Sequence, residues 1–227
     1  MLLEVIVQTI ADARAAAEGG ADRLEVVRAI HQGGLTPSLA VVRAIAIETA
    51  LPLRVMIREN AGYELAPGEL PVLRRAAAEF VEAGVDGLVV GFARSGEVVL
   101  DDLQEVLEGL RGVRVTFHRA FDSLRNPQSA IPTLTAVSHI DRILTSGGDG
   151  PPHVRSARLS DYGRLAGPRV AIIAGGGVDE EALASFVRDG CVREFHVGRA
   201  ARDGGDPDGE VSAARVRHLK TRLSRPG

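Results

Sequence analysis

The segment Glu18-Gly-Gly-Ala-Asp-Arg-Leu-Glu25 contains, in order, a helix ending, a turn and the start of an apolar strand. Similar junctions occur at Glu82–Leu88, Ser138–Leu144 and Arg188–Phe195. Three of the four carry a glycine where a residue in the left-handed conformation would end the helix. A junction that recurs along the chain predicts a repeated unit of helix and strand, and this repeat decides the fold.

On either side of these junctions, short apolar runs alternate with stretches of helical period that are rich in Ala, Leu, Glu and Arg. Strands are predicted at residues 2–7, 22–27, 53–58, 86–91, 113–118, 141–145, 169–174 and 194–198. Helices are predicted at residues 9–18, 37–50, 69–83, 101–110, 127–138, 153–166, 179–189 and 211–222. Eight such units predict an α/β protein, a single (β/α)8 TIM barrel over residues 1–227. The loop at 203–210 is expected to be mobile.

The composition excludes several classes of protein. With 45% hydrophobic and 25% charged residues, the chain is typical of soluble globular proteins and not of disordered ones. No apolar run reaches the roughly 18 residues of a membrane-spanning helix, and the acidic Glu4 without a basic lead-in argues against a signal peptide. A net charge of −3, 4% aromatic residues and no tryptophan argue against nucleic-acid binding. We therefore expect a cytoplasmic protein with neither membrane nor nucleic acid as partner.

Two scarcities restrict the chemistry further. Cys191 is the only cysteine, so one chain cannot build a metal site from several thiolates. Lys220 is the only lysine and lies close to the C-terminus, so the body of the barrel offers no amine for a Schiff base. Lysine-dependent aldolase chemistry is therefore excluded.

Alternation along the parallel strands predicts which residues face the barrel interior. The residues that face the surrounding helices must be apolar, which assigns the remaining positions to the inward face. Five strands then carry an inward ionisable residue: Glu4, Glu25, Arg58, His118 and His196. Active sites of TIM barrels lie at the C-terminal ends of the strands, so these residues predict a ligand site there. For any one of them alone, a structural ion pair or a buried core histidine is the alternative interpretation.

Glycine-rich turns follow the last two predicted strands, at Ala174–Val178 and His196–Ala200, and a similar turn lies at Thr145–Gly148. Turns of this kind next to helix N-termini present backbone N–H groups to an anion. The alternative is a tight turn that simply requires glycine. The candidate anion-binding residues are Arg58, Arg119, Ser146, Gly147, Gly175, Gly176 and Gly198.

The chain resembles the CutC copper-homeostasis family of cytosolic barrel proteins over nearly its whole length. The resemblance rests on Leu3-Glu4, Gly20–Glu25, Gly33–Ser38, Thr116–Asp122, Arg142–Gly147, Gly175–Val178 and Glu194–His196. It implies a TIM barrel, often a homo-oligomer, that is linked to copper tolerance and has copper as its ligand. Some members are proposed to bind Cu(I) through cysteines near the first two strands. The matching positions here are Ile6 and Val27, which carry no thiol, although Cu(I) prefers thiolate and thioether ligands.

Two functions are favoured, and a non-catalytic scaffold role is a third alternative. The first is a copper-homeostasis protein, in which His118, His196 and Glu25 could hold Cu(II), Zn(II) or Mn(II) instead of Cu(I). The second is an isomerase, epimerase or lyase that acts without a Schiff base on a small anionic or phosphorylated metabolite. Its candidate catalytic residues are Glu4 or Glu25 as base, His118 as acid or electrophile, and Asp122 as a group that orients Arg119 or His118.

Overall fold

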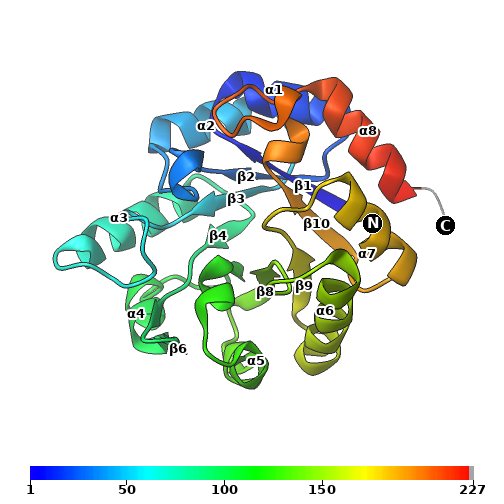
Figure 1. Ribbon diagram of the computed structural model, residues 1–227. Helices are drawn as coiled ribbons and strands as arrows, with labels where there is room; N and C mark the ends of the chain where they lie inside the picture. The colour runs from blue at the N-terminus through cyan, green and yellow to red at the C-terminus, as the bar shows by residue number, and fades with distance from the viewer. Residues whose placement is uncertain (225–227) are drawn as a thin grey trace.

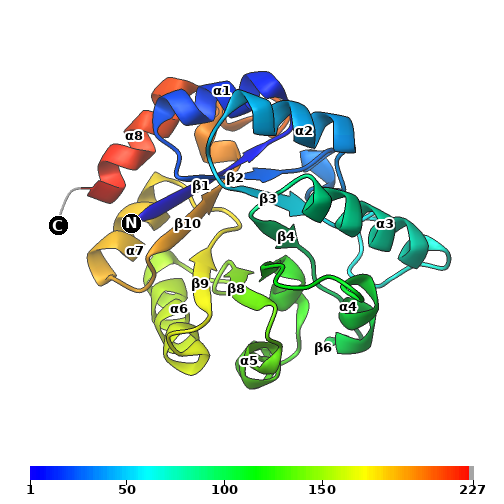
Figure 2. The same cartoon turned by 180° about the vertical axis from the view of Figure 1, so that it is seen from behind.

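Eight parallel strands close into a barrel in the computed structural model, which describes residues 1–224. Around the barrel the strands follow the order β1-β10-β9-β8-β7-β4-β3-β2, and helices cover the outer face (Figures 1 and 2). The barrel strands are β1 (Leu2–Val7), β2 (Arg23–Val26), β3 (Leu53–Met56), β4 (Gly87–Val89), β7 (Val115–Phe117), β8 (Ile140–Thr145), β9 (Ala171–Ala174) and β10 (Glu194–Val197). The helices are α1 (Ile10–Gly19), α2 (Leu39–Glu48), α3 (Glu69–Glu82), α4 (Leu100–Val106), α5 (Pro127–Ala136), α6 (Pro152–Ala166), α7 (Glu180–Asp189) and α8 (Ala213–Ser224). The predicted TIM barrel is confirmed, and residues 225–227 of the predicted domain lie outside the described residues.

Some element ends differ from the prediction, and two short strands were not predicted. The helix predicted at 101–110 ends at Val106, and the chain beyond it turns through Gly109 and Gly112, whose φ angles are 80° and 68°. The unpredicted strands β5 (Ala93–Arg94) and β6 (Glu97–Val98) form an antiparallel hairpin. Its two-residue turn, Ser95-Gly96, has positive φ at both positions, which is the geometry that such hairpins favour. Across residues 1–224, no helix combines the length and apolar character needed to cross a bilayer.

The strand register brings the predicted inward residues into adjacent positions. Leu3, Val5 and Val7 of β1 are fully buried in the core between strands and helices. The residues between them face the interior, where Glu4 lies opposite His196 of β10. Parallel pairing with β2 places Glu25 opposite Ile6, one step further along the same face. Three residues from distant parts of the sequence therefore meet inside the barrel.

An ion-pair layer, made by Arg23, Arg54 and Arg142 with their carboxylate partners, fills the barrel interior at the N-terminal ends of the strands. Arg54 is fully buried and donates from Nε to Asp86 at 2.7 Å and from both terminal nitrogens to Asp141 at 3.0 and 2.7 Å. Arg23 and Arg142 both donate to Glu194, at 2.7 and 2.8 Å, and they also pair with Glu4 and Asp141 respectively. These pairings satisfy the buried guanidinium groups and leave the opposite end of the barrel for a site.

The first and last helices lie side by side and complete the outer ring (Figures 1 and 2). Gly19 ends α1 against α8, where an added Cβ would lie 2.5 Å from the Cβ of Val216 and 2.7 Å from the carbonyl oxygen of Ala213. Lys220 of α8 also donates to the carboxylate of Asp22, beside the start of β2. Close helix packing at Gly19 thus joins the last βα unit to the first.

Candidate functional site

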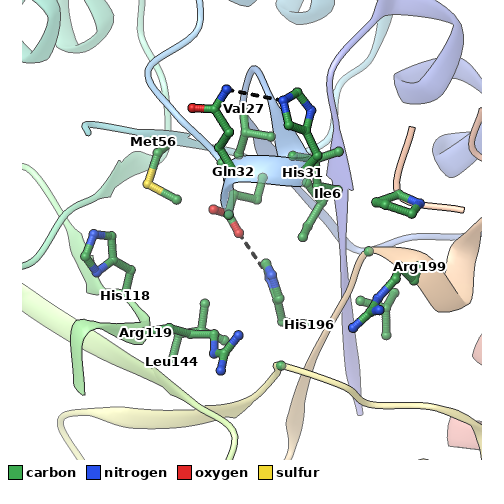
Figure 3. Close-up of a pocket in the computed structure, with 18 of the residues that line it drawn as sticks. Ile6, Val27, His31, Gln32, Met56, His118, Arg119, Leu144, His196 and Arg199 are labelled. Carbon is green, nitrogen blue, oxygen red and sulfur yellow. Dashed lines mark hydrogen bonds and ion pairs between the residues drawn. The ribbon is translucent and has the colours of Figure 1, made fainter. Parts of the chain in front are cut away.

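A cavity of about 510 Å³ opens at the C-terminal ends of the barrel strands. It is lined by strand residues that point inward and by the loops that follow β2, β3, β7, β9 and β10. Figure 3 shows His118, Arg119 and His196 around this pocket, with an apolar group of side chains above them. Of the predicted site residues, those that line it are Glu25, Arg58, His118, Arg119, Gly176, His196 and Gly198.

Glu4, Glu25 and His196 form a buried cluster next to Arg23. The Nδ1 atom of His196 lies 2.8 Å from Oε1 of Glu4 and 3.1 Å from Oε2 of Glu25. The first contact is a hydrogen bond, whereas the second is only an ion-pair approach because the Nδ1 proton points toward Glu4. Glu4 also accepts from Nε of Arg23. Oε2 of Glu25 is consequently buried without a hydrogen-bond donor among the described residues.

The two carboxylates of this cluster have opposite pKa shifts. Burial raises the pKa of Glu25 to about 7, and the neighbouring negative charge of Glu4 acts in the same direction. Burial also opposes ionisation of Glu4, but Arg23 and His196 together hold the pKa of Glu4 far below its usual range. The carboxylates of Glu25 and Glu4 outweigh the effect of burial on His196 and raise the pKa of its imidazole. The cluster therefore combines a Glu4 that is held in its charged form, a His196 whose positive charge is favoured, and a Glu25 whose pKa of about 7 lies close to neutral pH.

His118 is held as a neutral ring of defined tautomer. It caps the short 3-10 helix Arg119–Ser123, and its Nδ1 accepts the backbone N–H of Ala120 at 3.2 Å. A neutral ring that accepts at Nδ1 carries its proton on Nε2. Burial lowers the pKa of His118 to about 3, and the positive charge of Arg58 contributes to the shift. The Nε2–H group has no acceptor among the described residues, and its ring lines the pocket.

The arginines at the pocket have different roles. Arg58 donates to the carbonyl oxygens of Gly62 at 3.1 Å, Gly33 at 3.3 Å and Ala61, and its guanidinium lies 4.8 Å from the ring centre of Tyr63. Arg58 therefore holds the loops around the pocket, and its predicted anion-binding role stays a prediction.

Two other arginines keep N–H groups available. Arg119 uses only Nε, which donates to Asp122 at 2.9 Å. The Arg199 side chain makes no hydrogen bond or ion pair with the described residues, and only its backbone carbonyl is engaged, by the N–H of Arg202 at 3.0 Å. Because both side chains line the pocket, they are the cations that remain for a ligand.

Asp122 does not line the pocket, so the structure gives it no direct contact with a ligand. Its carboxylate accepts from Nε of Arg119, from the hydroxyl of Thr145 and from the backbone N–H of Ser146 at 3.1 Å. The predicted catalytic role is corrected to a positioning role. Asp122 fixes Arg119 against the loop that follows β8.

Three of the backbone N–H groups predicted to bind an anion are already used inside the protein. Ser146 donates to Asp122, Gly147 to the hydroxyl of Thr145 at 3.1 Å, and Gly175 to the carbonyl oxygen of Thr145 at 2.9 Å. These three backbone N–H groups are therefore not available to an anion in this structure. Gly176 remains, with a φ of 73° and so little space that an added Cβ would lie 2.7 Å from the guanidinium carbon of Arg119.

An apolar wall covers another side of the pocket. It consists of Ile6, Val27 and Met56 together with Ile30, and lies above His196 in Figure 3. The two positions that match the proposed copper-binding cysteines of the family thus face the pocket as aliphatic side chains. Met56 supplies the single soft ligand atom of the lining, and Cys191 lies elsewhere. This donor set does not fit Cu(I).

The predicted metal ligands His118, His196 and Glu25 do not come together as one set. The group whose ligand atoms lie within 4.8 Å of one another among residues 1–224 is Glu4, Glu25 and His196. In this group Nδ1 of His196 lies between the carboxylates, 2.8 Å from Glu4 and 3.1 Å from Glu25. Arg23 already neutralises Glu4, and its charge repels a further cation. The geometry is that of a proton-holding cluster.

Sequence reasoning missed several contributors. Arg23 lies two residues before Glu25, so strand alternation places it on the same inward face and could have revealed it. Arg199 lies in the quoted glycine turn but carried no assignment. The loop with His31 also reaches over the pocket, and Nδ1 of His31 lies 3.3 Å from the carboxylate of Asp208 in the 203–210 loop. Only the tertiary structure brings these two loops together.

Comparisons with known proteins agree on one family. The family model described as the CutC family matches residues 1–201. The human copper homeostasis protein cutC homolog is 31% identical over 207 residues, which cover 90% of this chain and 76% of the relative. A CutC family protein of Agrobacterium fabrum is 34% identical over 242 aligned positions, covering 99% of this chain and 94% of the relative.

Solved structures show the same architecture. The crystal structure of the CutC protein of Streptococcus agalactiae superposes with a TM-score of 0.79 at 24% identity, covering 86% of this chain and 97% of that chain. The thiamine phosphate pyrophosphorylase of Pyrococcus furiosus superposes with a TM-score of 0.60 at 14% identity, covering 99% of this chain and 97% of that chain. At these identities the likeness concerns the fold alone.

Proposed function

This chain belongs to the CutC family, and on that premise we propose that it acts in copper homeostasis while its pocket binds a small organic anion rather than Cu(I). The copper-related role is taken from the name of the human relative. The proposal of an organic anion in place of Cu(I) rests on the pocket lining. In this lining Arg119 and Arg199 have unengaged N–H groups, and no thiol is present. A cytoplasmic location and assembly as a homo-oligomer belong to the same proposal.

The balance of charge supports an anionic ligand. Glu4 is neutralised by its two partners, and Glu25 is half-neutralised by its raised pKa of about 7. Arg199 has no carboxylate partner among the described residues, and Arg119 keeps its terminal N–H groups unengaged although Asp122 pairs with its Nε, so the pocket offers cationic donors to an anion. The available volume of about 510 Å³ lies in the range of small-molecule sites.

The copper half of the proposal is tested by anaerobic titration of Cu(I) against a colorimetric chelator. We expect no competition from the wild type, from Met56→Leu or from His118→Ala, because the lining offers a single thioether. Tight binding by the wild type that Met56→Leu abolishes would contradict the argument from ligand softness. Binding that His118→Ala abolishes would show instead a copper site built on imidazole.

The anion half is tested by thermal unfolding in inorganic phosphate. We expect phosphate to raise the Tm of the wild type, since a ligand that binds only the folded state stabilises it. Arg119→Gln and Arg199→Gln should each weaken phosphate binding about 10-fold, as is expected for the loss of one charge-assisted hydrogen bond. Arg43→Gln, on the exposed side of α2, is the matched control and should bind as the wild type does. An equal response of all four proteins would refute the site.

A further inference from the structure

We propose that the pocket catalyses proton transfer at a carbon next to a carbonyl group, with Glu25 as the base and His118 as the hydrogen-bond donor to the carbonyl oxygen. The substrate class is a small hydroxyaldehyde or hydroxyketone that carries a phosphate or carboxylate. This inference rests on the proposed function, because Arg119 and Arg199 would hold the anionic end of that substrate.

Glu25 is the carboxylate that the structure leaves free to react. Its side chain is 2% exposed and lines the pocket, and Oε2 has no hydrogen-bond donor among the described residues. Glu4 accepts from both Arg23 and His196 and does not line the pocket. An ionised oxygen without a donor is costly in a buried site, so accepting a proton stabilises it. The choice between the two carboxylates therefore falls on Glu25.

Glu4, Arg23 and His196 act as positioning residues for this base. Glu4 holds the Nδ1–H of His196 in a hydrogen bond of 2.8 Å, and this bond keeps Nδ1 at 3.1 Å from Glu25. The imidazolium charge offsets the negative charge of Glu25 without occupying its oxygen through a hydrogen bond. Glu25 is thus held in position while its oxygen Oε2 remains able to accept a proton.

His118 supplies the complementary group. Its Nδ1 is occupied by the N–H of Ala120, so the ring presents Nε2–H and has no lone pair left for a second proton. A neutral imidazole donates a hydrogen bond to an oxygen on which negative charge develops. A tilted contact with the ring of Tyr63, 5.4 Å between ring centres, helps to fix the orientation of the His118 ring.

The step balances without a further reactant. Glu25 removes the proton from the carbon, the C–H electron pair forms a carbon–carbon double bond, and the carbonyl π pair moves to the oxygen. The resulting enolate oxygen accepts the hydrogen bond from Nε2–H of His118. Return of the proton from Glu25 restores the carbonyl compound. In D₂O, the protonated Glu25 exchanges its proton with solvent before the return, so the hydrogen delivered to the carbon is a deuteron.

The test follows deuterium incorporation into dihydroxyacetone phosphate in D₂O by ¹H NMR. We expect the wild type to catalyse exchange and Glu25→Gln, purified in parallel, to be slower by 10²–10⁴-fold, the usual range for loss of a general base. Glu25→Gln keeps the shape of the protonated side chain, and its Tm confirms that it is folded. His118→Phe retains a ring without the donor and should slow exchange at least 10-fold.

The outcomes separate this inference from the proposed function. One outcome is that phosphate raises the Tm of the wild type more than that of Arg119→Gln, while the wild type exchanges deuterium no faster than Glu25→Gln does. The pocket would then bind anions, and the catalytic inference would be overturned. If phosphate binding is absent as well, the proposed anion site also fails. A third comparison uses 2-phosphoglycolate, whose planar carboxylate mimics the enolate. The wild type should bind 2-phosphoglycolate more tightly than phosphate. His118→Phe should bind the two ligands with equal affinity.

Discussion

Two carboxylates of the same residue type, Glu4 and Glu25, acquire different properties from their partners. Both are buried inside the barrel, and both approach the same nitrogen of His196. Of these two carboxylates, Glu4 alone forms an ion pair with Arg23, which keeps it charged. Glu25 receives no hydrogen bond, and burial raises its pKa to about 7. Pairs of titratable groups whose environments separate their pKa values are typical of acid–base sites.

At the level of single residues, we predict that His118 stays neutral between pH 5 and 8 and carries its proton on Nε2. The unfolded chain binds a proton near the ordinary pKa of 6.5, whereas burial lowers the pKa of His118 to about 3 in the folded state. The unfolded state therefore binds more protons between these values, and this histidine lowers the stability as the pH falls from 6.5 toward 3. Two-dimensional ¹H–¹⁵N NMR of the imidazoles, assigned with His118→Asn, checks both statements. A titration midpoint near 6.5 would contradict them.

The individual site residues were predictable only in part. Alternation of inward and outward positions identified Glu4, Glu25, His118 and His196, because a strand must bury its outer face under helices. The hydrogen-bond partners of backbone groups were not predictable. Ser146 looked available for an anion until the tertiary structure showed that Asp122 accepts from it. A one-dimensional pattern gives the direction of a side chain but not its partner.

At the level of elements, the glycine at the end of α1 has a role that its neighbours in sequence do not show. Gly19 lies where the first and last helices touch, whereas Gly163, inside α6, has no atom within 4 Å of an added Cβ. Both glycines occupy helices, so both lose the same intrinsic helix propensity relative to alanine. Only the packing differs between them.

This difference gives a paired prediction. Gly19→Ala should destabilise the protein by about 1–3 kcal/mol, because the new methyl group overlaps Val216 and Ala213. Gly163→Ala should stabilise it by about 0.5–1 kcal/mol through helix propensity alone. Urea unfolding measured by circular dichroism gives both values. Equal changes in the two variants would show that the helix contact is not close.

The order of elements could be read from the repeated junctions, whereas the smaller elements could not. The hairpin β5–β6 depends on Ser95-Gly96, a turn signal too short to be recognised beside the longer periodic segments. Helix α4 is shorter than predicted because its apolar period continues to Leu107 while the backbone leaves the helical conformation there. Local periodicity therefore overestimates a helix whose apolar pattern continues into a glycine-containing turn.

At the level of the whole molecule, the barrel interior is divided between the ion-pair layer and the pocket. The layer belongs to the architecture, since its arginines reach carboxylates on different strands. We predict that Arg54→Met lowers the free energy of unfolding by about 3–5 kcal/mol, because Asp86 and Asp141 lose a buried partner. Arg75→Met, on the exposed side of α3, should stay within about 0.5 kcal/mol of the wild type. Urea unfolding of both variants checks the comparison. A change at Arg54 as small as that at Arg75 would show that the ion-pair layer contributes little to the free energy of unfolding.

The ion-pair layer determines how molecules enter and leave the barrel. It occupies the interior at one end, so the pocket communicates with solvent only at the other end. Whatever enters the pocket must leave by the way it came, and an outgoing molecule blocks an incoming one. A product released from this barrel would therefore inhibit competitively, and its departure sets an upper limit on turnover.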